Sequence, residues 1–220
     1  MTRVVAVADL HGHLPLDLPD GDLLVIAGDV CPLADHSVPF QAAWLEERLY
    51  PWMDALPHAE IVWIAGNHDF ACQEDGWRPG GRGSYLLDSG AEASGLTLHG
   101  TPWVPNLKRW AFYAGDDVRS EKVAMIPRVD ILVSHGPPRG TGDRLVGGTE
   151  VGCRFLAQRI EQEPPRLCLF GHIHEAYGLW QREGTTLANV AFVDELYEVR
   201  PNATRVFELG PGDEPAKAIL

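Results

Sequence analysis

Five short polar clusters carry the residue types that could do chemistry in this chain. They are Asp9-Leu10-His11, Gly28-Asp29, Gly66-Asn67-His68-Asp69, Ser134-His135-Gly136 and Gly171-His172-Ile173-His174. Carboxylate, amide and imidazole groups are ligands of divalent metal ions, and the clusters contain no cysteine, which excludes a thiolate site. Five of the nine histidines fall in these clusters, a coincidence that side-chain packing alone would rarely produce. The other four, His13, His36, His58 and His99, are expected to be surface or structural residues.

Each cluster directly follows a short apolar run. The runs are residues 4–8, 23–27, 61–65, 131–133 and 167–170. Because the apolar residues are continuous rather than alternating, they predict strands that are covered on both faces. Ligands of open α/β sheets bind beyond the carboxyl ends of the strands. We therefore expect all five clusters to meet in one site.

The rest of the chain predicts one α/β domain. Helices are expected over residues 38–50 and 150–162, and Pro51 should kink or end the first of them. Further strands at 97–99, 185–190 and 204–209 are assigned to a second sheet. Since no repeat or linker divides the sequence, residues 1–210 are expected to form a single domain and residues 211–220 a frayed tail.

The donors are numerous enough for two metal ions. One ion could be held by Asp9, His11 and His174, and another by Asn67, His135 and His172. Asp29 is the natural bridge between them, because a carboxylate has two oxygens and can serve two cations. This nitrogen and oxygen donor set suits Mn²⁺, Fe or Zn²⁺, of which we favour Mn²⁺.

Such a pair of ions indicates chemistry at phosphorus. Two metals about 3.5–4 Å apart lower the pKa of a shared water, so that a bridging hydroxide can attack in line, and they neutralise the developing charge. His68 has no ligand role, and we expect it to protonate the leaving oxygen as general acid. The predicted catalytic residues are His68 and Asp29.

In this order the five clusters resemble the signature of the calcineurin-like metallophosphoesterases: D-x-H, G-D, G-N-H-[DE], [ST]-H-G and G-H-x-H. The resemblance covers residues 4–209. It implies the ligand roles given above and a four-layer αββα sandwich of two mixed β-sheets flanked by helices, with the dinuclear site at the carboxyl ends of the strands. Further residues, including Gly100-Thr101-Pro102-Trp103 and Asn189, are similar to the small MPPED-type (metallophosphoesterase domain-containing) phosphoesterases.

Two details refine the expected activity. The chain continues Val30-Cys31-Pro32 after Gly28-Asp29 and lacks the D-R-G of Ser/Thr protein phosphatases, which argues against a phosphoprotein substrate. Some MPPED-type proteins have lost the first histidine of G-H-x-H and are feeble enzymes, whereas His172 is present here. We expect hydrolysis of small phosphodiesters or phosphomonoesters, nucleotides among them, with diesters preferred.

The charge balance limits the alternatives. At a formal net charge of −13, with no basic cluster beyond Lys108-Arg109, a nuclease or a lipid-binding protein has little electrostatic support. The positive charge that a phosphate needs would come from the metals, whose +4 exceeds the −2 of Asp9 and Asp29. A nucleotide-binding regulatory protein with a metal cage and negligible turnover remains the alternative hypothesis.

Cellular location and the substrate pocket are predicted less directly. Four dispersed cysteines without a C-x-x-C motif fit a reducing compartment, and neither a membrane span nor a signal peptide is found, so we expect a cytoplasmic protein. Arg139 and Arg144 could clamp a phosphate or be solvated loop charges. Trp103 and Trp110 could stack a base or belong to the core. The natural substrate and the oligomeric state stay open.

Overall fold

The computed structural model describes residues 1–220 and contains four helices and two six-stranded sheets. The helices are α1 (Val38–Trp44), α2 (Tyr50–Ala55), α3 (Asp116–Ala124) and α4 (Arg154–Gln162). The strands are β1 (Thr2–Val7), β2 (Leu23–Ala27), β3 (Glu60–Ile64), β4 (Ser84–Tyr85), β5 (Ser89–Ala93), β6 (Leu96–Thr101), β7 (Ile131–Ser134), β8 (Leu167–Phe170), β9 (Gly178–Arg182), β10 (Thr185–Asn189), β11 (Arg205–Leu209) and β12 (Lys217–Ala218). Short turns of other helix types are η1 (Leu45–Leu49), η2 (Phe70–Gln73) and η3 (His174–Ala176).

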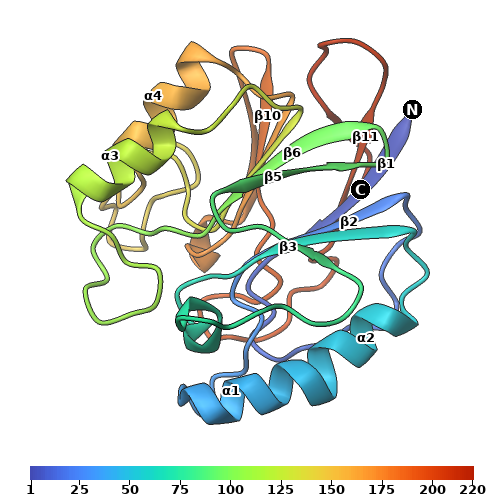
Figure 1. Cartoon of the computed structure of the whole chain (residues 1–220). Helices are drawn as coiled ribbons and strands as arrows, with labels where there is room; N and C mark the ends of the chain where they lie inside the picture. Colours follow the sequence, from blue (N-terminus) through green and yellow to red (C-terminus); the bar gives the residue numbers. More distant parts are fainter.

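The two sheets pack face to face and each carries helices on its outer side (Figure 1). The first sheet has the order β12-β11-β1-β2-β3-β4 and is covered by α1 and α2. The second has the order β5-β6-β7-β8-β10-β9 and is covered by α3 and α4. Both sheets mix parallel and antiparallel pairs. The expected four-layer αββα sandwich of two mixed sheets is confirmed.

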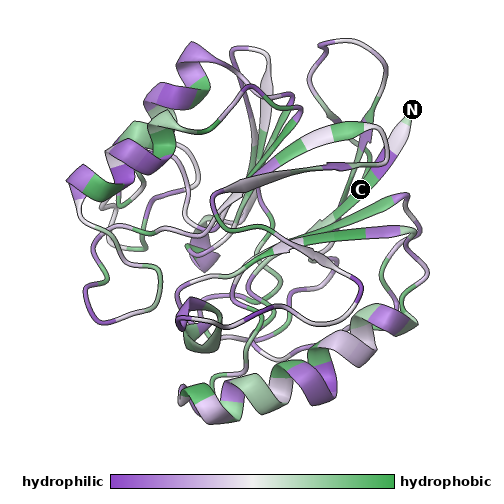
Figure 2. Ribbon diagram, in the orientation of Figure 1, coloured by the Kyte–Doolittle hydropathy of each residue, from purple (hydrophilic) through white to green (hydrophobic).

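Three separate apolar cores explain why the predicted strands are apolar on both faces. On β1, Val5 and Val7 pack under α1 and α2, whereas Val4 and Ala6 point into the space between the sheets. A third, smaller core lies between the second sheet and α3 and α4. Figure 2 shows hydrophobic strands at the centre and helices that alternate between hydrophobic and hydrophilic residues. Successive strand residues thus enter different cores, because side chains alternate between the faces of a strand.

Two expectations about the elements are wrong, and a third had two alternatives, of which one is excluded. The strand expected at 204–209 belongs to the first sheet, where β11 pairs antiparallel with β1. Of the two outcomes expected at Pro51, an end or a kink, the helix does not end there but continues to Ala55, and it is distorted into the wide π-helical turn η1 just before the proline, which accommodates the missing N–H and the bulk of the proline ring. The helix expected from residue 150 begins only at Arg154, since the N–H of Cys153 donates to the carbonyl of Pro137.

The tail is also more ordered than expected. Lys217–Ala218 forms strand β12 against β11, and Ala216 is buried. The Ala216 N–H donates to the Arg166 carbonyl, and the Thr186 hydroxyl donates to the Ala216 carbonyl at 2.5 Å. Residues 216–220 are therefore part of the sandwich rather than frayed. No helix of the protein combines the length and apolar character that crossing a bilayer requires.

Candidate metal centre

The five polar clusters meet where the carboxyl ends of strands from the two sheets come together. β1, β2 and β3 of the first sheet lead into the clusters of Asp9, Asp29 and Asn67, and β7 and β8 of the second lead into the other two. Ala8, directly after β1, forms a parallel bridge with Ala191, directly beyond β10. This bridge joins the two sheets at the edge where the clusters converge.

Three glycines allow the donor side chains to come this close. A Cβ on Gly171 would overlap Asp9 Oδ2, and one on Gly66 would overlap Asp29 Oδ1. A Cβ on Gly28 would lie 2.5 Å from His135 Nδ1. Each approach is far closer than a van der Waals contact, so glycine is required at the first position of these three clusters.

The backbone of the site is unusually strained. Four of the seven predicted donors have a left-handed backbone conformation: Asp9 (φ 54°), His11 (φ 42°), Asp29 (φ 53°) and His172 (φ 68°). This conformation is unfavourable for residues with a side chain, and such strain gathers at functional sites where the surrounding fold enforces it. The strain turns these side chains toward one centre, directly beyond the strands.

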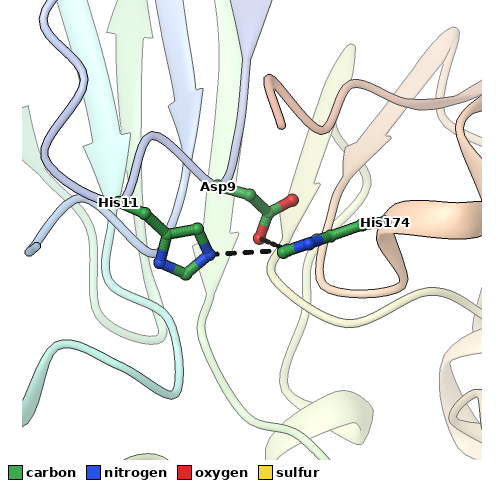
Figure 3. Close-up of side chains that lie close together, drawn as sticks. All are labelled: Asp9, His11 and His174. Carbon is green, nitrogen blue, oxygen red and sulfur yellow. Dashed lines mark hydrogen bonds and ion pairs between the residues drawn. The ribbon is translucent and has the colours of Figure 1, made fainter. Parts of the chain in front are cut away.

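Asp9, His11 and His174 form a compact buried group (Figure 3). The Nε2 atoms of the two histidines lie 3.4 Å apart, and His174 Nε2 lies 3.6 Å from Asp9 Oδ1. Both Asp9 oxygens accept the backbone N–H of His172, at 2.9 and 3.1 Å, which fixes the carboxylate plane. The three donor atoms thus surround a single point, as the sequence predicts.

Asn67, His135 and Asp29 form a second group beside the first. His135 Nε2 lies 2.9 Å from Asn67 Oδ1 and 3.3 Å from Asp29 Oδ2. The same Asp29 oxygen lies 3.8 Å from His11 Nε2, so this carboxylate stands between the two groups. The His172 ring, 5.1 Å from the His135 ring between centroids, lines the adjoining cleft. All seven predicted donors are brought to the site.

The hydrogen bonds of two imidazoles show that the donors fit cations. His135 Nδ1 and His174 Nδ1 donate to the carbonyls of Ala27 and Asp194, both at 3.0 Å. Because a carbonyl only accepts, the neutral rings carry their proton on Nδ1 and present the Nε2 lone pair to a carboxylate. Lone pair and carboxylate repel each other unless a proton on the ring or a metal ion lies between them. The donor set therefore fits divalent metal ions.

The pKa shifts of the site without metal also indicate that its carboxylates are stabilised by positive charge. Burial acts to raise the pKa of the Asp29 carboxyl, but the charges of His135 and His68 outweigh it and hold this pKa well below its usual range. Burial acts to lower the pKa of His135, but the Asp29 carboxylate raises it to about 9. Burial lowers the pKa of His11 to about 4, which keeps that ring neutral and able to act as a ligand.

The donors open onto a cleft of about 350 Å³. His68 lies in its wall, and its backbone N–H donates to Asp29 Oδ1 at 2.7 Å. Trp110 packs on His68 with ring centroids 4.3 Å apart, whereas Tyr197 contacts His11 and His174 at about 5 Å. The lining residues include no Lys or Arg. Positive charge at the bottom of the cleft would have to come from metal, as the charge balance of the sequence suggests.

Sequence reasoning misses two residues of this region. Tyr197 follows no strand-end motif, and only its place after the last strand of the second sheet draws attention to it. His36, expected at the surface or in a structural role, has its Nε2 atom 3.1 Å from His68 Nδ1. Its position seven residues after Asp29, in the loop that leaves the site, is the one signal in the sequence that points to it.

Other candidates lie elsewhere. Arg139 and Arg144 are exposed and pair with Glu150 at 3.9 and 3.3 Å, so they are solvated loop charges. Trp103 donates its indole N–H to Asp88 at 2.7 Å and packs beneath Lys122. Of the aromatic pair, only Trp110 is placed to contact a bound molecule.

Comparison with known proteins agrees with the site. The family model described as calcineurin-like phosphoesterase matches residues 2–176. Metallophosphoesterase domain-containing protein 1 of Homo sapiens is 31% identical over 90% of this chain and 68% of its own length. The UPF0046 protein C25E10.12 of Caenorhabditis elegans is 30% identical over 87% of this chain and 75% of its own.

Solved structures support the fold. The crystal structure of TT1561 of Thermus thermophilus superposes with a TM-score of 0.58 at 16% identity, over 86% of this chain and 89% of that one. Another crystal structure superposes with a TM-score of 0.66 over 99% of this chain and 98% of its own, at 13% identity. With the strand-end clusters, the converging donors and the matched family model, the chain belongs to the calcineurin-like phosphoesterase family.

Proposed function

We propose that the protein is a dinuclear metal-dependent phosphoesterase that hydrolyses small phosphoesters, nucleotides among them, and prefers diesters. The observation that supports this most is the convergence of seven nitrogen and oxygen donors, two of whose histidines have their tautomer fixed by backbone carbonyls. One ion would be held by Asp9, His11 and His174, the other by Asn67, His135 and His172, with Asp29 shared. Mn²⁺ is the ion we favour, with Fe or Zn²⁺ as alternatives.

The protein's own residues divide the remaining work. When bound, the two ions would supply a nucleophile from water and neutralise charge on the phosphoryl oxygens. His68 faces the cleft and donates its Nε2 proton to the leaving oxygen as the P–O bond breaks. The shape of the cleft and the faces of Trp110 and Tyr197 hold an organic substituent of the ester.

The composition of the cleft favours diesters. A diester carries one negative charge at neutral pH and a monoester nearly two, and the cleft offers no Lys or Arg to the second charge. Its rim instead contains Glu175 and Glu195, the latter 3.7 Å from Arg200. A cytoplasmic location is part of the proposal, because all four cysteines are free and buried.

The test is turnover of diphenyl phosphate, whose basic phenolate leaving group needs a proton, by protein loaded with Mn²⁺, compared with the His68→Ala variant and with His13→Ala as a matched control. His13 is an exposed histidine of the loop after β1, and the structure gives it no side-chain hydrogen bond. We expect turnover by the wild type and the control, and strongly reduced turnover by His68→Ala. No release of phenol above the His68→Ala level, together with tight metal-dependent binding of AMP, would instead favour a nucleotide-binding regulatory protein.

A further inference from the structure

His36 makes a contact that the assigned donors do not need. Its Nε2 lies 3.1 Å from Nδ1 of His68, and His36 is not among the residues that line the cleft. The His36 ring is held by its own neighbours, Phe70 at 5.6 Å and Trp110 at 5.3 Å between centroids. The geometry points to His36 as a positioning residue that holds His68 for proton donation to the leaving group. This inference rests on the proposed role of His68.

The backbone around His68 is fixed independently of its ring. The buried Gln41 side chain of α1 donates to the His68 carbonyl at 2.7 Å and accepts the N–H of Ala71 at 3.0 Å. The backbone N–H of His68 donates to Asp29. These bonds hold the main chain, and Trp110 packs on the ring, but neither determines which ring nitrogen carries a proton. Among the hydrogen bonds of the structure, only the one with His36 involves the His68 ring.

The hydrogen bond also suits the proton transfer. A His68 imidazolium has a proton on each nitrogen, so its Nδ1–H must donate, and a neutral His36 must accept through Nε2. As the P–O bond breaks, its electron pair passes to the leaving oxygen, and the Nε2 proton of His68 passes to the same atom. His68 is then neutral with its proton on Nδ1, and the bond to His36 is unchanged. The transfer requires no rearrangement of the pair.

The kinetic test compares two leaving groups. Methyl phenyl phosphate expels a strongly basic phenolate that needs a proton, whereas methyl p-nitrophenyl phosphate expels a weakly basic one that does not. We expect His36→Phe to lower kcat/KM about 10- to 100-fold for the phenyl ester and less than about threefold for the nitrophenyl ester. His36→Gln, whose side-chain carbonyl can accept from Nδ1, should recover most of the loss. An equal loss on both esters would overturn the inference, because it would indicate a merely structural residue.

A spectroscopic test does not depend on turnover. In long-range ¹H–¹⁵N spectra of the Zn²⁺-loaded protein, neutral His68 should be protonated on Nδ1 in the wild type and in His36→Gln. It should average between its tautomers in His36→Phe. The same His68 spectrum in all three proteins would overturn the inference. If His68→Ala loses the same factor in kcat/KM on both esters, His68 is not the general acid. The spectra would still decide whether His36 orients the His68 ring.

Discussion

The two donor groups are built to different degrees of rigidity. In the group of Asp9, His11 and His174, all donor atoms lie within 4.8 Å of one another and two of the three residues have a left-handed backbone. In the group of Asn67, His135 and His172, the first two touch, but the His172 ring lies in the cleft wall and no ring hydrogen bond orients it. A preorganised site binds with less ordering cost. We therefore expect the first group to bind its ion more tightly than the second.

The largest effect should come from the residue that the two groups share. Loss of a residue that only supports a metal ligand lowers metal affinity by about 10- to 100-fold. Asp29→Asn should lower the affinity for both ions by more than this, because it weakens a direct ligand of both. Counting metal per chain by mass spectrometry after dialysis should give close to none. Retention of one ion per chain would show that Asp29 serves one group only.

Separate removal of His172 and His174 should distinguish the groups. His172→Ala should retain about one ion per chain, in the first group, while turnover of bis-p-nitrophenyl phosphate falls by about 10²-fold or more. His174→Ala should weaken the tighter binding step instead. Calorimetric titration of metal-free protein with Mn²⁺ measures both. If the two variants lose the same binding step, the division into two groups is wrong.

Alanine substitution of two glycines should disturb each donor group by steric overlap alone, with a smaller effect on metal binding. Gly171→Ala presses a methyl group against Asp9 of the first group, and Gly66→Ala presses one against Asp29 and His135. Each should lower the free energy of unfolding by about 1–3 kcal/mol, measured in urea, since the surroundings must shift. Gly147→Ala is the control, because a Cβ there meets nothing within 4 Å. Metal affinity should fall in the first two variants and not in the control.

The smallest effect is expected from the basic loop. Arg139 and Arg144 pair with Glu150 rather than with the cleft, and exposed ion pairs contribute little. The double variant Arg139→Gln, Arg144→Gln should keep kcat/KM for bis-p-nitrophenyl phosphate within about twofold and stability within about 0.5 kcal/mol of the wild type. A rise in KM with kcat unchanged would instead show that these residues contact the substrate.

The sequence predicts the convergence of these seven side chains because each lies in a polar cluster that directly follows a buried strand. The same patterns place β1, β2, β3, β7 and β8 correctly. What fails depends on distant contacts. Nothing near Thr204 says that β11 pairs with β1, and nothing near Glu150 says that the N–H of Cys153 bonds to Pro137. His36 is missed for the same reason, since its partner His68 lies 32 residues away and only the fold brings them together.

The pairing of the C-terminal tail with β11 affects how the two sheets can separate locally. Arg166 donates to the carbonyls of Glu214 and Gly210 at 2.8 and 2.6 Å, and Ala216 is bonded to both Arg166 and Thr186. The tail of the first sheet is thereby fastened to the second sheet at the end remote from the metal centre. Local opening of the two layers must then break bonds at both ends. The amide of Ala216, four residues from the end of the chain, should exchange its hydrogen with solvent as slowly as an amide of the central strands.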